Sequence, residues 1–160
     1  MDSNPLEAKN VRPPVKLTDA DKENFFRFFL RDEPYQETMK LFDGKFAIQF
    51  RGLTVDDQDQ IYTQMAADDK TGEGVSQVAY LNKIQLYRLS LAIVTIDGKP
   101  FGEGVKVSDD EKANGTYIVK KRIAAFDKWP VAKLFIINQA YVDFERKMEA
   151  LVGEVKDPSF

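Results

Sequence analysis

The strongest constraint on the fold is a change of hydrophobic period between residues 36 and 51. Apolar and polar residues alternate on both sides of the pair Asp43-Gly44, as in strands with one buried face. Asp-Gly favours the positive φ angles of a two-residue turn. The sequence therefore predicts a β-hairpin over residues 36–51. Because a hairpin alone is marginally stable, it must lie against a helix or join strands of another chain.

Helices are predicted on both sides of this hairpin. Thr18 with Asp21 forms a capping box before the first helix, which Pro34 ends. Thr54 caps the next helix, and two aspartates follow it in the first turn. The inner face of this second helix is predicted to carry Ile61, Tyr62 and Met65.

Three further segments are assigned to the C-terminal half. A long helix is expected from Ser76 to about Val94, with a turn at residues 97–100 and a glycine-rich loop or linker at 102–115. A helix starting at Thr116 ends at Trp129-Pro130, and the last helix runs to about Val152. That helix carries a heptad-like apolar seam, which packs on its own domain or on another chain: Leu134, Ile137, Tyr141, Phe144, Met148 and Leu151.

The elements together predict an α+β fold. It is a mostly helical single domain with an N-terminal β-hairpin and four to five helices. The domain covers residues 18–155, between an arm at 1–17 that contains three prolines and a short tail at 156–160. The arm is either a flexible end or a segment that becomes ordered on a partner.

Composition disfavours catalysis and several kinds of ligand. The chain has no cysteine and no histidine, which removes the commonest nucleophile–base pairs and transition-metal ligands. The acidic pairs at 56–57, 68–69 and 109–110 fit helix starts and loops, and we assign them no catalytic or metal-binding role. We therefore expect a binding protein without enzyme activity, cofactor or metal.

Charge and hydropathy restrict the partners further. The net charge is −3, and the densest basic cluster is only Lys120-Lys121-Arg122, so nucleic-acid binding is not expected. The polar N-terminus gives no signal peptide, and the longest apolar stretch, residues 89–96, is too short to span a bilayer. We expect a protein that acts in a cytoplasm.

Aromatic residues are the candidates for partner binding. Phe25, Phe26, Phe28 and Phe29 lie within five positions of the first helix, and they cannot all face one neighbour. Phe160 at the C-terminus has no helix nearby to cover it. These five residues are predicted to contact a protein partner.

The order of these parts resembles the small tail assembly chaperones, or related tail proteins, of tailed bacteriophages. The resemblance covers residues 18–155 and rests on pattern and order. Its segments are FFRFFL, KLFDGKFAIQFRGLT, YLNKIQLYRLSLAIVTIDGKPF and WPVAKLFIINQAYVDFERK. Such proteins coat the long helical tape-measure protein before the tail tube assembles around it, and they often self-associate.

The resemblance implies a chaperone in the host cytoplasm that binds the tape-measure protein during tail morphogenesis and forms a homo-oligomer. The alternative is a structural virion subunit: a minor tail, baseplate or connector protein. A carboxylate-based enzyme is the third hypothesis, and no residue spacing in the sequence supports it.

Overall fold

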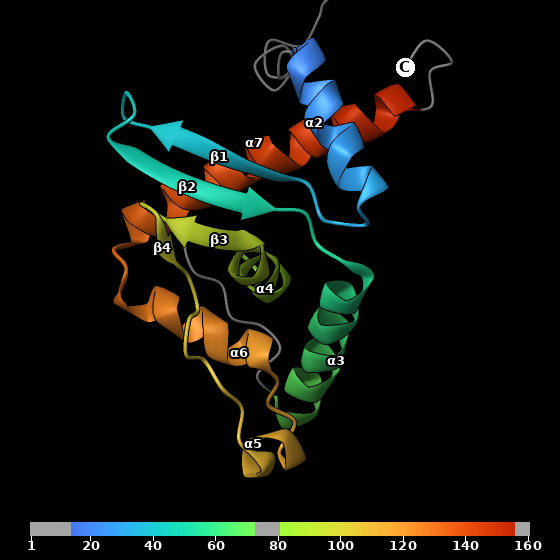
Figure 1. The fold of residues 1–160 in the computed structure, drawn as a ribbon. Coiled ribbons are helices and arrows are strands. Elements are labelled where there is room, and N and C mark those ends of the chain that lie inside the picture. The colour runs from blue at the N-terminus through green and yellow to red at the C-terminus, as the bar shows by residue number, and fades with distance from the viewer. Residues whose placement is uncertain (1–13, 73–80, 156–160) are drawn as a thin grey trace, which may run out of the picture.

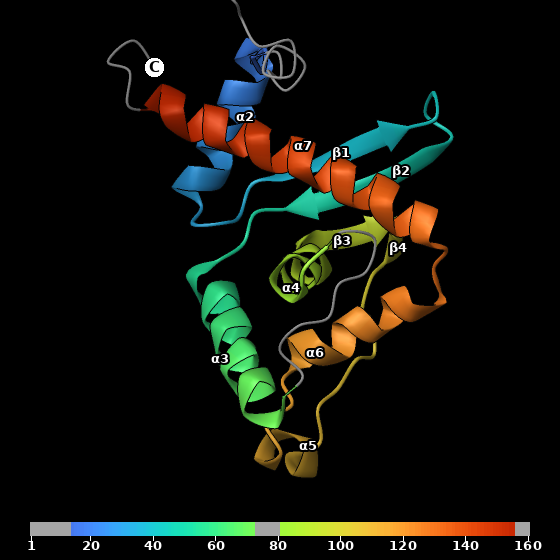
Figure 2. The ribbon, with the colours of Figure 1, turned by 180° about the vertical axis from the view of Figure 1, so that it is seen from behind.

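The computed structural model describes residues 14–72 and 81–155, and its centre is a four-stranded antiparallel sheet (Figure 1). The strands lie in sequence order: β1 (Gln36–Leu41), β2 (Phe46–Arg51), β3 (Ile93–Ile96) and β4 (Lys99–Pro100). The long helix α7 (Val131–Val155) crosses the β1–β2 hairpin on one face (Figure 2). Six α-helices are present in the described parts of the chain, which confirms the α+β class.

The predicted hairpin is confirmed, but its tip is longer than expected. β1 and β2 pair from Gln36–Arg51 to Leu41–Phe46, so residues 42–45 form a four-residue loop. Phe42 and Asp43 adopt positive φ angles as well as Gly44, and the Lys45 amide donates to the Phe42 carbonyl at 3.1 Å. The prediction of a two-residue turn at Asp43-Gly44 was therefore wrong.

A third strand was missed inside the predicted long helix. Helix α4 (Lys83–Ala92) starts at the cap Asn82 and stops where four β-branched residues begin. Those residues form β3, which pairs with β2. The turn at Asp97-Gly98 joins β3 directly to β4. The sheet is thus larger than an N-terminal hairpin, and the expected helix start at Ser76 lies outside the described residues.

The two helices that flank the hairpin begin as the sequence predicts. Helix α2 (Asp19–Leu30) and helix α3 (Val55–Thr71) each start with a complete capping box, formed by Thr18 and Asp21 and by Thr54 and Asp57. On α3, Ile61 is buried, whereas Tyr62 is exposed, contrary to the expected inner face.

The predicted loop at 102–115 contains a short helix. Ser108 caps helix α5 (Asp109–Ala113) through a third capping box, with Glu111 as its acidic partner. Helix α6 (Ile118–Ile123) begins two residues after the expected Thr116 and continues as the 3₁₀-helix η1 (Ala124–Lys128). The break at Trp129-Pro130 before α7 is confirmed.

The main core lies between α7 and the sheet. Five of the six seam residues of α7 are buried and Met148 is partly buried, in one cluster with Ile48, Phe50 and Ile93 of the sheet. The seam thus packs on its own domain. A second cluster joins α3, α4 and α6 through Ile61, Tyr87, Leu91 and Val119. Of the predicted arm, Leu17 packs against the main core, and residues 1–13 lie outside the described residues.

Candidate protein-binding surfaces

The four phenylalanines of α2 divide between two faces of the helix. Phe25 and Phe28 pack on the ring of Tyr35, with centroid distances of 5.9 and 5.7 Å, and Tyr35 stacks on Phe144 of α7. Phe26 and Phe29 face outward and are 48% and 64% exposed. The structure therefore packs the partly buried Phe25 and Phe28 against the core and leaves Phe26 and Phe29 accessible.

An exposed apolar stripe follows from this division. Phe26, Phe29 and Leu30, which is 65% exposed, are spaced three and four positions apart and lie on one side of α2. We call these three residues the α2 stripe. Such spacing is typical of helices that bind the apolar groove of a partner. Phe160, the fifth predicted contact, lies outside the described residues.

An ion-pair cluster fixes the orientation of α2. Lys147 of α7 lies 2.9 Å from a carboxylate oxygen of Asp21 and 2.5 Å from one of Glu37 on β1. Burial lowers the pKa of Lys147, but the two carboxylates outweigh this effect and raise it. Burial likewise acts to raise the pKa of Asp21, and bonds from Thr18 and Lys147 lower it overall. The α2 stripe is therefore exposed on a helix that ion pairs attach to α7 and β1.

A second apolar surface lies where the hairpin tip meets the start of α7. It is a groove of about 450 Å³, which we call the tip groove. Its walls are almost entirely apolar: Phe42, Phe46, Pro130, Ala132, Lys133, Ile136 and Ile137. The one charged residue, Lys133, has its Nζ atom 4.7 Å from the centre of the Trp129 ring. This groove can take up apolar side chains.

Phe42 at the rim of this groove is unusual in two respects. Its φ angle is +53°, a left-handed conformation that costs a residue with a Cβ atom about 1–2 kcal/mol. Its side chain is nevertheless 62% exposed, so burial does not offset that cost. Residues in strained backbone conformations cluster at functional sites, which makes Phe42 a candidate for contact with another molecule.

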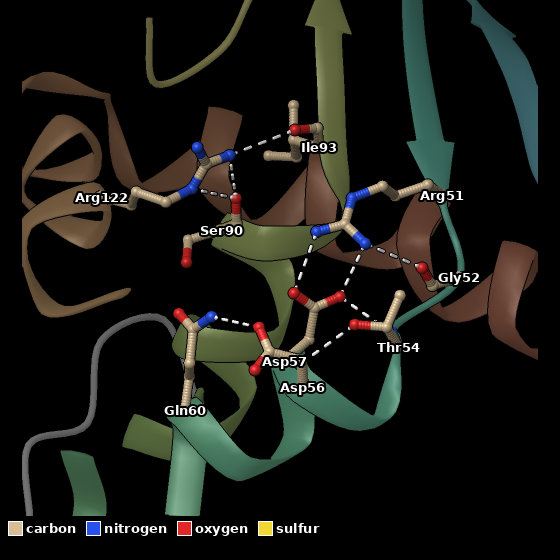
Figure 3. Close-up of polar contacts among 9 residues, drawn as sticks. All are labelled: Arg51, Gly52, Thr54, Asp56, Asp57, Gln60, Ser90, Ile93 and Arg122. Atoms are coloured by element: carbon tan, nitrogen blue, oxygen red, sulfur yellow. Dashed lines mark hydrogen bonds and ion pairs between the residues drawn. The ribbon is translucent and has the colours of Figure 1, made fainter. Parts of the chain in front are cut away.

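Polar side chains connect β2 with α3 and α6 with the end of α4 (Figure 3). Arg51 of β2 makes two hydrogen bonds to Asp57 of α3, of 2.6 and 3.2 Å. Burial acts to raise the pKa of Asp57, but Arg51 and Thr54 lower it. Arg122 of α6 donates to the carbonyls of Ser90 and Ile93 at the end of α4, where cations suit the helix dipole.

Arg122 also lines a cleft of about 330 Å³ together with Arg51 and Gln60. Burial lowers the pKa of Arg122, and nearby Arg51 adds to that effect. Arg122 lies over the Phe101 ring, and any side chain at Gly102 would collide with its guanidinium group. These contacts explain the position of Arg122 by packing and helix capping.

A buried polar cluster joins α3, α4 and α6. The Tyr87 hydroxyl donates to Asp68, and Lys120 lies 3.3 Å from the same carboxylate. The Gln64 side chain donates to Asp68 and to the Gly115 carbonyl, and it accepts a bond from the Tyr117 amide. The sequence predicts a loop around Asp68, whereas Asp68 is a buried residue of α3. This cluster holds three helices in place.

The remaining acidic pairs occupy structural positions. Asp56 accepts a bond from Gln60, Asp57 caps α3, and Asp109 and Asp110 lie in the first turn of α5. Among the described residues, no three acidic side chains gather into a possible metal site. No helix within residues 14–72 and 81–155 is long and apolar enough to cross a membrane.

Comparisons with protein-family models, curated proteins and solved structures find no match to this chain. The aromatic cluster of α2 is predicted from the sequence, whereas the tip groove is not. The available signal was Phe42 beside Asp43-Gly44, where a turn usually carries a polar residue.

Proposed function

We propose that this chain is a bacteriophage tail assembly chaperone that covers apolar stripes of the tape-measure protein before the tail tube forms. The observation that carries the proposal is the α2 stripe, an exposed apolar face of a helix that is attached through Lys147 and Tyr35. The resemblance of the order of its segments to that of such chaperones supports it. On this proposal the chain acts in the host cytoplasm, uses no cofactor and catalyses no reaction.

The mechanism is burial of apolar surface on both partners. A tape-measure helix that lies against Phe26, Phe29 and Leu30 removes these side chains and its own apolar stripe from water. Each buried side chain of this size contributes about 1.5–3 kcal/mol, and part of that is offset by the entropy lost on association. The small number of exposed side chains gives the reversible binding that a chaperone needs for release.

Co-expression tests the proposal. The tape-measure protein encoded in the same genome is produced alone, with the wild-type chain, or with the double variant Phe26→Ser/Phe29→Ser. We expect the wild-type chain to keep the tape-measure protein in the supernatant and the variant to fail. The matched control is Val55→Ser/Tyr62→Ser, which removes two exposed apolar side chains from α3. This control is expected to behave as wild type.

Two results would contradict the proposal. If the tape-measure protein is equally insoluble with and without the wild-type chain, the chaperone function is wrong. If mass spectrometry finds the chain in purified virions in amounts typical of tail components, the alternative of a structural virion subunit replaces it.

A further inference from the structure

We propose that the chain binds a second copy of itself head to tail, with the α2 stripe of one copy in the tip groove of the next. The partner in this contact is the same protein. Both surfaces are apolar, and within the described residues neither is covered by another part of the chain.

The two surfaces lie too far apart to meet within one molecule. The tip groove is built on the first turns of α7, around Lys133 and Ile136. Helix α2 is attached at the other end of α7, where Lys147 contacts Asp21 and Glu154 contacts Lys22. At about 1.5 Å per residue, Ile136 and Glu154 are separated by roughly 27 Å along the helix. Figures 1 and 2 show α2 and the hairpin tip at opposite ends of α7.

The chemistry of the two surfaces is complementary. The stripe presents two phenylalanines and a leucine in a helical ridge, and the groove offers almost only apolar walls. The stripe lies at the C-terminal end of α2, where the helix dipole is negative and where one exposed cation, Arg31, is followed by two exposed acids, Asp32 and Glu33. The groove carries Lys133 at its wall. An inserted α2 end would thus place negative charge next to a lysine.

The symmetry of this contact has a defined consequence. Two different surfaces of the same chain form a heterologous interface, which produces rings if the rotation closes and open filaments if it does not. Each internal copy would then have both apolar surfaces covered. If the proposed chaperone function holds, a tape-measure helix would compete with the neighbouring copy for these surfaces, but the self-association does not depend on that function.

A mixing experiment with the purified full chain tests this contact. Phe29→Asp places a charge in the stripe, and Ile136→Asp places one in the groove; both positions are at least partly exposed, so folding should be retained. Masses are measured by sedimentation and light scattering, and circular dichroism verifies folding. We expect wild type to grow beyond a dimer with rising concentration and each variant alone to stay monomeric near 18.3 kDa.

The decisive sample is the equimolar mixture of the two variants. Each variant retains one intact surface, so the mixture should form a one-to-one heterodimer and nothing larger. The control Val55→Asp, on the exposed start of α3, should assemble as wild type. A monomeric wild type overturns the proposal. A mixture that stays monomeric overturns it as well. An assembly that persists in either single variant also overturns it, since this result would indicate pairing through another surface such as the open edge of β1.

Discussion

Helices α2 and α3 begin with the same device but are attached to the molecule differently. Each starts with a threonine cap and an aspartate at the third position, and in each the aspartate also pairs with a cation. For α3 the cation is Arg51, six residues before Asp57. For α2 it is Lys147, which comes from the last helix of the fold.

The two ion pairs also differ in how deeply the carboxylate is buried and in whether its cation binds a second carboxylate. The Asp57 side chain is 9% exposed and receives two bonds from one arginine, whereas the Asp21 side chain is 19% exposed and shares Lys147 with Glu37. A bidentate, buried arginine pair fixes geometry more strictly than a shared lysine. Helix α3 is therefore fixed by its own sequence neighbourhood, whereas α2 depends on the C-terminal helix.

Removal of the cation from the α3 attachment should have the largest effect. Arg51→Met leaves the carboxylate of Asp57 buried without its charged partner. We expect a loss of about 3 kcal/mol in the free energy of unfolding, the lower end for a broken buried pair because Arg51 is partly exposed. Urea unfolding followed by circular dichroism measures the loss.

A surface pair provides the control for Arg51→Met. Arg27 and Glu23 form an exposed i,i+4 pair on α2, so Arg27→Met should cost about 0.5 kcal/mol or less. Equal losses in the two variants would show that burial does not distinguish these pairs, and α3 would then not be the more strictly fixed helix.

Removal of the cation that attaches α2 should cause a smaller loss of stability, confined mainly to α2. Lys147→Met removes the cation shared by Asp21 and Glu37, and we expect a loss of about 2 kcal/mol from charged hydrogen bonds. Hydrogen exchange should show faster exchange of α2 amides, while α3 amides keep their protection relative to global stability. If α2 and α3 lose protection equally, α2 is not attached independently of α3.

The two caps allow a finer comparison. Thr54→Ala and Thr18→Ala each remove a side-chain acceptor for the amide of the third residue, with typical costs near 1 kcal/mol. The loss should be larger at Thr54, since its bond is partly buried and that at Thr18 is exposed. Thermal unfolding of both variants tests the order, and Ser replacements at each site should restore most of the stability.

Contacts between residues close in sequence could be predicted, whereas contacts between residues far apart in the chain could not. Thr18 and Asp21 identify a capping box from four residues of sequence, and the alternation around Asp43-Gly44 identifies a hairpin. The pairing of Lys147 with Asp21 depends on how α7 crosses the sheet, which no local pattern records. Strand β3 was missed for a related reason: residues 93–96 continue an apolar helix pattern, and pairing with β2 decides their conformation. The tip groove likewise exists only because α7 starts beside the hairpin tip.

The smallest expected effect is the dependence of folding stability on the ionisation of Asp21 at acidic pH. Since the folded state holds the pKa of Asp21 below the ordinary 3.8, its ionised form stabilises the fold above that pH, and this contribution disappears as pH falls through the lowered folded value. The variant Asp21→Asn lacks the titration. It should be less stable than wild type near neutral pH, and the difference should shrink steadily as the solution is acidified below 3.8. Asp19→Asn, an exposed residue in the same turn, serves as the control with little change. A stability difference that stays constant down to acid pH would mean that folding does not lower the pKa of Asp21, so that neither the bonds from Thr18 nor Lys147 stabilise its ionised form.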